Sequence, residues 1–403
     1  MRITFVHFLN GVMPSYSHAI ASLTSSVSNH DVVLVNIRDE SPNNISMILE
    51  TKPDIILMSI MSNHYQYANK LCAGLKKVSE IEVWVGGSHI NAVPQDFYES
   101  NFDAACYGEG EIILPQALNH FEKGISYESS AWLTKNSVHQ SRQPAVVENL
   151  DDLPLPRLDL FDIDDILTYP SVMFSRGCPY GCTYCLSRQG GIGGHVRWKS
   201  VERAIRETKD LVNYAQPKEI YFDDDTFLKN PKWVSAFLSL YKQDVGLPFY
   251  CNSRPEAVSE KICELLVDSG CVALGIGIES GSEKIRRNIL NRNISDEEII
   301  TSFQIAKSKG LSTWSFNMIG VPSEQPDDLD ATIRLNDKAG VDFVRVSVYT
   351  PYPGTILSEG TYIEDFPSSY FAALNRLPDS MKEKANTWVN KLKENGQLWN
   401  DDI

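Results

Sequence analysis

The hydrophobic residues of the first 120 positions form short runs of strand length, separated by stretches with the spacing of an amphipathic helix. One run, DIILMSI at 54–60, is almost continuously apolar, as in a strand buried on both faces of a parallel sheet. The alternation predicts a doubly wound, Rossmann-like domain over residues 1–125. The expected strands are 3–9, 31–37, 54–60, 81–85 and 104–107, and the expected helices are 19–27, 45–50, 65–78 and a last one that ends near 121.

Residues 171–360 repeat a strand followed by a helix six times, which predicts a partial (β/α)6 TIM barrel and not a complete eightfold one. The chain is therefore assigned to the α/β class, with the Rossmann-like domain first and the barrel second. The expected strands are 170–174, 219–222, 248–252, 271–278, 311–318 and 343–349, and the expected helices are 201–214, 232–241, 256–268, 283–289, 296–309 and 329–338.

Two further regions complete the predicted organisation. Residues 126–170 are expected to form a linker that is stiffened by prolines and includes a candidate hairpin strand at 131–138. Residues 361–403 are expected to form a short C-terminal helical tail. Its large apolar side chains, Trp388, Leu392 and Trp399, are expected to pack on the barrel.

Three cysteines, Cys178, Cys182 and Cys185, follow the first barrel strand at the spacing C-x3-C-x2-C. Soft thiolates this close together suit zinc or an iron–sulfur cluster. Zinc usually takes a closed set of four ligands, and no second CxxC pair or HxxxH motif lies nearby. Three thiolates on one loop suit a 4Fe-4S cluster that keeps one iron open for a substrate or cofactor. A structural zinc site is the alternative.

Polar residues also stand where the other barrel strands end. Asp224 and Asp225 could bind a cation or a substrate amine, or accept a proton, and are the candidate catalytic residues; a solvated turn is the alternative. Arg254 is suited to a bidentate contact with a carboxylate. Glu279 can accept hydrogen bonds from hydroxyl or ammonium groups, and Gly277 indicates a close approach to its strand.

Open α/β sheets bind ligands at the carboxyl ends of their strands. In the first domain no GxGxxG motif follows the first strand, which disfavours a nicotinamide site. The glycines at the strand ends instead allow close backbone approach to a large ligand, and a domain that only packs is the alternative. The candidate cofactor-binding residues there are Asn10, Ser59, Gly86, Gly87, Ser88, Gly108 and Glu109.

Composition narrows the possible partners. The 403 residues suffice for two domains with separate cores, and the net charge of −15 disfavours a nucleic-acid partner. The five cysteines outside the loop are scattered on apolar elements, which favours core packing in a reducing cytoplasm over a disulfide framework. No stretch approaches the ~20 apolar residues of a membrane helix, and the N-terminal run lacks a signal cleavage site, so we expect a cytoplasmic protein with no membrane partner.

The segment 175–188, SRGCPYGCTYCLSR, resembles the signature of the radical S-adenosylmethionine (SAM) superfamily, C-x3-C-x-aromatic-C, with Tyr184 as the aromatic residue. In that superfamily the open iron of a 4Fe-4S cluster binds SAM. The sequence GIES at 277–280 resembles the cofactor motif of the family's fourth strand, and IGVPSE at 319–324 resembles the segment that packs on adenine. The resemblance implies that Cys178, Cys182 and Cys185 hold the cluster and that Tyr184, Arg254, Gly277, Glu279, Ser280 and Gly320 contact SAM.

The first domain resembles the cobalamin (B12)-binding domain that precedes radical SAM cores. The sequences that carry this resemblance are PDIILMSIMSNHY, WVGGSHINAVPQDF and DAACYGEGE. The chain lacks the DxHxxG motif whose histidine ligates cobalt in other cobalamin proteins, and members of the radical group commonly lack it too. The resemblance implies cobalamin as a third cofactor, with a domain of this shape that holds no cobalamin as the alternative.

Together the two resemblances imply a cobalamin-dependent radical SAM enzyme that methylates an unactivated carbon of a small metabolite, through a 5′-deoxyadenosyl radical and methylcobalamin. The alternative is a radical SAM cyclase or rearrangement enzyme that does not transfer methyl. An external one-electron reductant of the flavodoxin or ferredoxin type is expected in either case. A methylthiotransferase acting on transfer RNA is disfavoured, because its N-terminal domain normally adds three cluster cysteines and only Cys72 and Cys106 occur here. A non-catalytic electron-transfer protein would leave Glu279 without a role.

Overall fold

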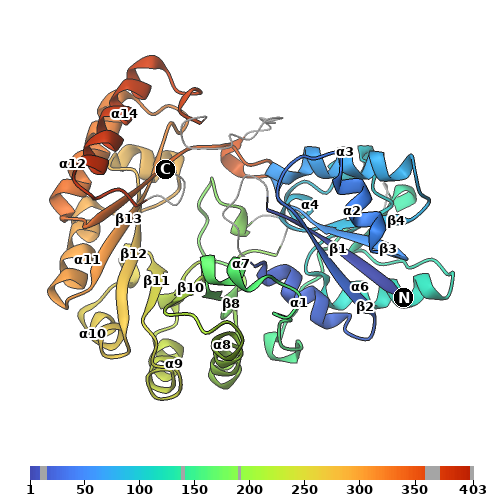
Figure 1. Ribbon diagram of the computed structural model, residues 1–403. Helices are drawn as coiled ribbons and strands as arrows, with labels where there is room; N and C mark the ends of the chain where they lie inside the picture. Colours follow the sequence, from blue (N-terminus) through green and yellow to red (C-terminus); the bar gives the residue numbers. More distant parts are fainter. Residues whose placement is uncertain (10–15, 138–140, 189–191, 359–372, 400–403) are drawn as a thin grey trace. The chain divides into compact units, whose positions relative to one another are not determined.

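The computed structural model describes residues 1–9, 16–137, 141–188, 192–358 and 373–399, which fall into two compact units (Figure 1). The first unit comprises Met1–Tyr169, Cys185–Lys199 and Tyr352–Asp365, and the second comprises Pro170–Tyr184, Ser200–Pro351 and Phe366–Ile403. The boundary therefore crosses the cysteine loop between Tyr184 and Cys185.

The first unit is built on a six-stranded sheet in the order β2-β1-β3-β4-β5-β6. Five strands are parallel and β6 is antiparallel to β5, so the predicted Rossmann-like fold is confirmed. The strands are β1 (Arg2–Phe8), β2 (Asp31–Ile37), β3 (Ile55–Ser59), β4 (Glu82–Gly86), β5 (Ala104–Cys106) and β6 (Trp132–Thr134). Residues 126–169, which we expected to form a linker, thus contribute β6 to the first unit.

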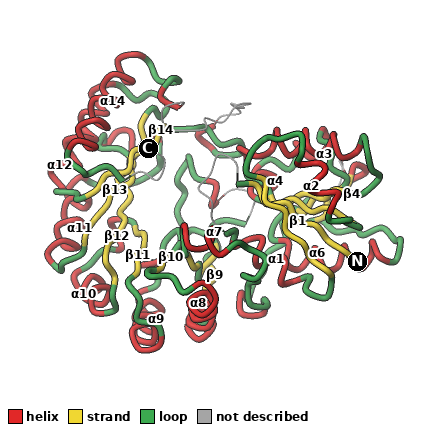
Figure 2. The backbone as a smooth tube through the Cα atoms, in the orientation of Figure 1, coloured by secondary structure: helices red, strands yellow, loops and turns green. Residues whose placement is uncertain are grey.

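Helices cover both faces of this sheet, as Figure 2 shows. Side chains from the strands and from the helices on one face meet in a core that includes Ile56, Leu71 and Phe97. Parallel strands buried on both faces explain the nearly continuous apolar runs in the sequence. The helices are α1 (His18–Ser26), α2 (Asn44–Glu50), α3 (Tyr65–Lys76), α4 (Ser88–Ala92), α5 (Asp96–Glu99), α6 (Gly110–Glu122) and α7 (Ile163–Thr168).

The second unit has six parallel strands in the order β14-β13-β12-β11-β10-β7, so that neighbours in the sheet are also neighbours along the chain. This arrangement confirms the predicted partial barrel of six strands. The strands are β7 (Ser171–Val172), β10 (Ile220–Phe222), β11 (Phe249–Ser253), β12 (Cys271–Glu279), β13 (Ser312–Ile319) and β14 (Phe343–Val348). Two further short strands, β8 (Ser175–Arg176) and β9 (Arg197–Trp198), flank the cysteines along the chain.

The helices of the second unit lie on the outer face of its sheet (Figure 1). They are α8 (Val201–Ala215), α9 (Pro231–Asp244), α10 (Glu260–Asp268), α11 (Asp296–Ser308), α12 (Pro326–Ala339) and α14 (Asp379–Glu394). Ser295 caps α11, and Glu298 completes a capping box with it. Helix α10 begins later than we expected, because Pro255–Ala257 forms a separate 3₁₀ turn. The helix expected at 283–289 contains a π-helical turn over Ile285–Ile289.

The C-terminal tail packs against the barrel as the sequence predicts. The indole of Trp399 stacks on that of Trp314 in β13, with centroids 5.2 Å apart and planes 8° apart. The backbone around Trp399 also exchanges hydrogen bonds with Val344 in β14. In helix α14, Trp388 and Leu392 are buried. Among the described residues, no helix combines the length and apolar character needed to cross a membrane.

We expect replacement of Trp399 by alanine to lower the free energy of unfolding by about 2 kcal/mol, because a stacked, partly buried indole is lost. Phe at this position keeps a stacking ring and should cost less than about 1 kcal/mol. Denaturant unfolding of the full chain measures both variants. Equal stability of W399A and the wild type would show that the stack contributes nothing to the barrel.

Candidate active site

The cysteine loop is held in place by the segment that follows the π-helical turn. The hydroxyl of Thr183 donates to the carbonyl of Ile289 at 2.6 Å, and the side-chain amide of Asn291 donates to the carbonyl of Gly181 at 2.7 Å. Asn291 has a φ of 53°, a left-handed conformation that few non-glycine residues adopt. The loop therefore has a defined conformation before any cofactor is considered.

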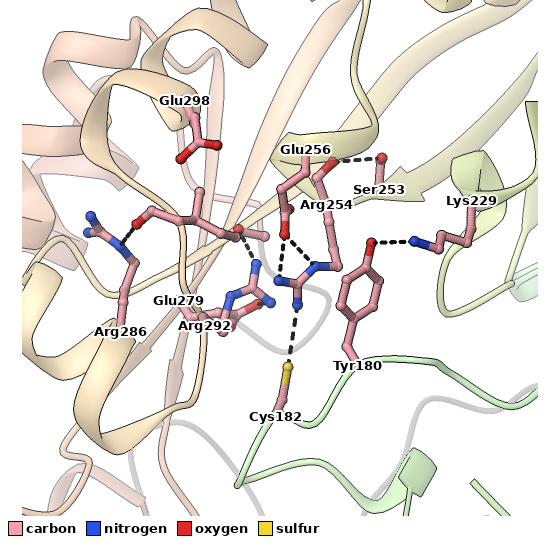
Figure 3. Close-up of polar contacts among 12 residues, drawn as sticks. Tyr180, Cys182, Lys229, Ser253, Arg254, Glu256, Glu279, Arg286, Arg292 and Glu298 are labelled. Carbon is pink, nitrogen blue, oxygen red and sulfur yellow. Dashed lines mark hydrogen bonds and ion pairs between the residues drawn. The ribbon is translucent and has the colours of Figure 1, made fainter. Parts of the chain in front are cut away.

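Two of the three thiols receive hydrogen bonds from N–H groups. The guanidinium of Arg254 donates to Sγ of Cys182 at 3.4 Å, as Figure 3 shows, and the backbone N–H of Ser187 donates to Sγ of Cys185 at 3.4 Å. Donors aimed at sulfur are the surroundings that iron–sulfur clusters use. Among the described residues, no three His, Cys, Asp or Glu side chains converge as they would around a single ion. A cubane cluster does not need such convergence, because each thiolate binds a different iron.

A buried cation, Arg292, joins the end of β12 to the cysteine loop. Its guanidinium lies 3.5 Å from the carboxylate of Glu279 and donates to the hydroxyl of Tyr184 at 3.3 Å (Figure 3 shows the contact with Glu279). Burial raises the pKa of the Tyr184 hydroxyl well above its usual range, and the charge of Glu279 adds to the rise. Burial also raises the pKa of the Glu279 carboxyl, an effect that Arg292 partly offsets.

The backbone around Glu279 is shaped by this pair. Arg292 donates to the carbonyl of Gly277 at 2.7 Å, and a Cβ on Gly277 would stand 2.7 Å from a carboxylate oxygen of Glu279. The close approach that the sequence predicts at Gly277 is therefore made by side chains of the chain itself. Glu279 has a φ of 67°, and the pairing of β12 with β13 shifts register beside it. This local strain turns the carboxylate out of the strand.

Ser280 is fully buried behind the same strand end. Its carbonyl accepts a hydrogen bond from Arg286 at 2.8 Å, and its hydroxyl accepts one from the N–H of Ser282 at 3.2 Å. Arg286 has no exposed surface and also pairs with Asp296. Ser280 thus shapes the turn after Glu279, and its contact with the cofactor stays a prediction.

Gly320 begins the loop after β13 with a φ of 78°, and a side chain there would overlap Leu377 of the tail. Its N–H donates to the carboxylate of Glu324, which also accepts from the N–H of Val321 at 3.3 Å. The other oxygen of Glu324 is buried with no hydrogen-bond partner among the described residues. Burial raises the pKa of the Glu324 carboxyl from 4.5 to about 7, although the two N–H donors oppose the rise.

The two candidate catalytic aspartates differ in exposure. Asp224 is buried and accepts hydrogen bonds from the N–H groups of Phe174 and Ser175 and from the Ser175 hydroxyl, at 2.5–3.2 Å. These donors hold the chain between β7 and the cysteine loop, so the geometry favours a positioning role for Asp224. Asp225 is exposed, and it stays a candidate for contact with substrate.

Arg254 binds a carboxylate of the chain itself. Its guanidinium donates twice to Glu256, at 3.2 and 2.8 Å, and lies 3.8 Å from the centroid of the Tyr180 ring (Figure 3). In the structure its donors are shared between Glu256 and the thiol of Cys182, and contact of Arg254 with SAM stays a prediction.

The candidate cobalamin residues of the first unit lie at the carboxyl edge of its sheet. Ser59 ends β3, Gly86 ends β4, and Ser88 begins α4 with its side chain exposed. Hydroxyl groups from neighbouring strands therefore share one accessible edge, where open α/β sheets bind ligands. Asn10, which we also expected at this edge, lies outside the described residues.

Two glycines at this edge are required by the packing of the unit. Gly87 has a φ of 102°, and a Cβ there would stand 2.5 Å from the carbonyl oxygen of Ile60. Gly108 has a φ of 106°, and a Cβ there would overlap the backbone of Ala145. Each glycine therefore makes room for a neighbouring segment of the chain, and the approach of a large ligand to this edge stays a prediction.

Glu109 is likewise bound within the first unit. Its carboxylate pairs with the buried guanidinium of Arg197 at 2.6 Å and accepts the N–H of Val147 at 2.6 Å. Arg197 belongs to the segment that follows the cysteine loop, and it also donates to the carbonyl of Val147 at 2.5 Å. Glu109 therefore anchors the Cys185–Lys199 segment.

Sequence reasoning missed several of the groups that organise the site. Arg292 lies far along the chain from Glu279, in a polar stretch that matches no motif. The only sequence signal for a buried arginine was the cluster of arginine and asparagine residues at 286–293, RRNILNRN. Stretches of this kind are usually exposed to solvent. The missed residues are Tyr180, Glu256, Arg286, Arg292 and Glu324.

Family models match both parts of the chain. The radical SAM superfamily model matches residues 172–335, and the B12 binding domain model matches residues 14–118. Among curated proteins, the "uncharacterized methyltransferase PH0819" of Pyrococcus horikoshii is 30% identical over 355 residues, covering 84% of this chain and 77% of that protein. The "anaerobic magnesium-protoporphyrin IX monomethyl ester cyclase" of Rubrivivax gelatinosus is 22% identical, covering 94% of this chain and 74% of that protein.

Among solved structures, the radical SAM methyltransferase TsrM of Kitasatospora setae, determined with cobalamin and a 4Fe-4S cluster bound, aligns with a TM-score of 0.73. It is 14% identical and the alignment covers 88% of this chain and 73% of that one, so the likeness shows the fold. The site and the fold define a radical SAM enzyme. The chain belongs to the radical SAM superfamily, in the group that carries an N-terminal B12-binding domain.

We expect replacement of Asp224 by asparagine to lower the free energy of unfolding by about 2 kcal/mol, because the amide keeps one acceptor oxygen and turns its NH2 group toward the buried N–H of Phe174. The matched change at exposed Asp225 should stay within about 0.5 kcal/mol. Denaturant unfolding of D224N and D225N measures the difference. Equal stability of D224N and the wild type would leave a catalytic role for Asp224 open.

Glu324 is expected to make stability depend on pH. A carboxyl whose pKa is higher in the folded chain stabilises the fold below pH 4.5, and this contribution is lost as the pH rises toward 7. The Gln variant does not titrate, so the free energy of unfolding of E324Q minus that of the wild type should rise by up to about 3 kcal/mol across this window. Denaturant unfolding at several pH values tests the trend, and a flat difference would contradict it.

Proposed function

We propose that this protein is a cobalamin-dependent radical SAM methyltransferase that methylates an unactivated carbon of a small metabolite. The observation that carries the proposal is the constellation of Glu279, Arg292 and Tyr184, which joins the strand-end carboxylate to the cysteine loop. The N-terminal unit of the B12-binding type supports the choice of methyl transfer over other radical reactions.

Each part of the second unit has a separate task in this proposal. Cys178, Cys182 and Cys185 would hold a 4Fe-4S cluster, and Glu279 would accept hydrogen bonds from the ammonium or ribose of SAM. The loop that begins at Gly320 would pack on the adenine. Arg292 would orient the Glu279 carboxylate, and its charge opposes the rise in the pKa of that carboxyl that burial causes.

The first unit fits a large cofactor held mainly by shape and hydroxyl contacts. Its strand-end edge offers Ser59, Ser88 and the exposed side chain of Met61. His89 is not available as a cobalt ligand, because its nitrogens contact Ser62 at 3.1 Å and Asp96 at 3.2 Å. When bound, the cluster, SAM and cobalamin supply the radical and the methyl group, and the chain positions them and excludes water.

A second reading, a radical cyclase or rearrangement enzyme, is supported by the cyclase relative, which aligns over nearly the whole chain. In both readings the substrate is a small molecule, and an external one-electron donor of the flavodoxin or ferredoxin type supplies the electron. The two readings differ in whether a methyl group reaches the product.

Product analysis tests the proposal. Reconstituted protein given methyl-labelled SAM, cobalamin, a low-potential reductant and candidate small metabolites should yield 5′-deoxyadenosine together with a labelled, methylated product. Deoxyadenosine without label in any product would favour cyclisation or rearrangement. No deoxyadenosine under strong reduction would contradict radical chemistry altogether.

The cysteine ligands are tested by single replacements. We expect C182S to lose most of the bound iron and at least 100-fold of SAM cleavage, because one iron of the cluster loses its thiolate. Cys263 is the matched control: burial in helix α10 raises the pKa of its thiol to about 11, which leaves it a neutral packing residue. C263A should keep its iron. Iron content and deoxyadenosine formation are measured together, and full iron in C182S would remove this cysteine from the ligand set.

A further inference from the structure

The cysteine loop carries a second charged assembly beside that of Glu279 and Arg292, and the charge of Arg254 also acts on Glu279. It consists of Arg254 at the end of β11, Glu256 two residues later, Tyr180 within the cysteine loop, and Cys182 (Figure 3). We propose that Arg254 is a positioning residue that sets the reduction potential of the cluster held by Cys182. This inference rests on the proposed function, because it requires that a cluster is bound.

The contacts of Arg254 leave its guanidinium one orientation. Nε and Nη2 both donate to a single oxygen of Glu256, at 3.2 and 2.8 Å. The face of the guanidinium covers the ring of Tyr180 at 3.8 Å from its centroid. Nη1 is thereby directed at Sγ of Cys182, at 3.4 Å. The planar guanidinium is held on one edge by Glu256 and on one face by Tyr180. It therefore loses little further conformational entropy when it donates to Cys182.

Burial makes the contact electrostatically strong. The side chain of Arg254 is only 10% exposed and Cys182 is 9% exposed, so water screens the charge poorly. A cluster gains one negative charge when it takes up an electron. A neighbouring cation and an N–H donor on a ligating sulfur favour the more negative state, which raises the reduction potential. Glu256 acts in the opposite direction, because its charge offsets part of the guanidinium.

Lys229 provides an internal comparison. Its ammonium lies 5.0 Å from the centroid of the same Tyr180 ring and donates to the Tyr180 hydroxyl at 3.4 Å, and its side chain is exposed. It therefore shares the aromatic partner of Arg254, without an N–H contact on a thiolate. If a positive charge near the loop were enough to shift the reduction potential, both Lys229 and Arg254 would shift it. If a directed N–H contact is needed, only Arg254 of these two would shift it.

The test is a potentiometric titration of the reconstituted cluster with dithionite, followed by electron paramagnetic resonance. R254Q should lower the midpoint potential by an amount that corresponds to at least tenfold in the reduction equilibrium, 59 mV for one electron. E256Q should shift it in the opposite direction, since the guanidinium loses its counter-charge. K229Q should change the equilibrium by less than threefold, because solvent screens this charge.

Shifts of the midpoint potential in opposite directions for R254Q and E256Q distinguish an electrostatic effect on the cluster from general damage to the loop. An unchanged potential in R254Q, or shifts of R254Q and E256Q in the same direction, would overturn the inference. If R254Q does not retain a cluster, R254K replaces it, since the lysine keeps a charge but loses the fork; its potential must still fall while that of E256Q rises.

Two further outcomes separate this inference from its premise. The shift should be present both without and with added SAM. A shift seen only with SAM would assign Arg254 to the cofactor carboxylate and overturn the tuning role. Wild-type protein that takes up no cluster would overturn the proposed function and this inference together, whereas a normal cluster indifferent to residue 254 would overturn this inference alone.

Discussion

The buried guanidinium of Arg292 is the interaction on which the candidate site depends. It touches the carboxylate of Glu279, the carbonyl of Gly277 and the hydroxyl of Tyr184, and so binds the end of β12 to the cysteine loop. Desolvating an arginine costs several kcal/mol, and this cost is offset only where nearly all its donors meet acceptors. Its Nε has no partner among the described residues, so the pair is less than fully compensated. Such a group is stable in place because the surrounding backbone leaves it no other arrangement.

Two other buried polar side chains at this end of the barrel are also bound by groups of the chain itself. Asp224 is occupied by the N–H groups before the cysteine loop, and Arg286 by the turn after Glu279. Both side chains are removed from solvent, and both fix backbone that carries site residues. The non-glycine residues with left-handed backbone include Glu279 and Asn291. Strain at these positions is sustained because hydrogen bonds to neighbouring segments determine the conformation, which is how a site acquires its geometry before a ligand arrives.

The sequence was sufficient for the parts of the fold that depend on local pattern. Both sheets follow from apolar runs and turn residues, because parallel strands buried on two faces leave a clear signal. The partners of site residues were not accessible in this way. Arg254 was predicted at a strand end and directly follows β11, but its contact with Glu256 was not predicted. Pairing depends on side-chain direction, which strand-end position alone does not determine.

In the first unit, too, the contacts of individual residues could not be predicted from the sequence, and these contacts affect how a cofactor could be bound. Gly87 and Gly108 were predicted to allow the approach of a ligand, and the need of their backbones to pass close to Ile60 and Ala145 was not predicted. His89 is likewise held between two protein oxygens. With the glycines and this imidazole engaged by the protein, recognition at the strand-end edge falls to accessible hydroxyls, backbone groups and apolar surface. A large cofactor could be bound there through area and shape, and His89 would supply no ligand to its metal, because both ring nitrogens contact protein oxygens.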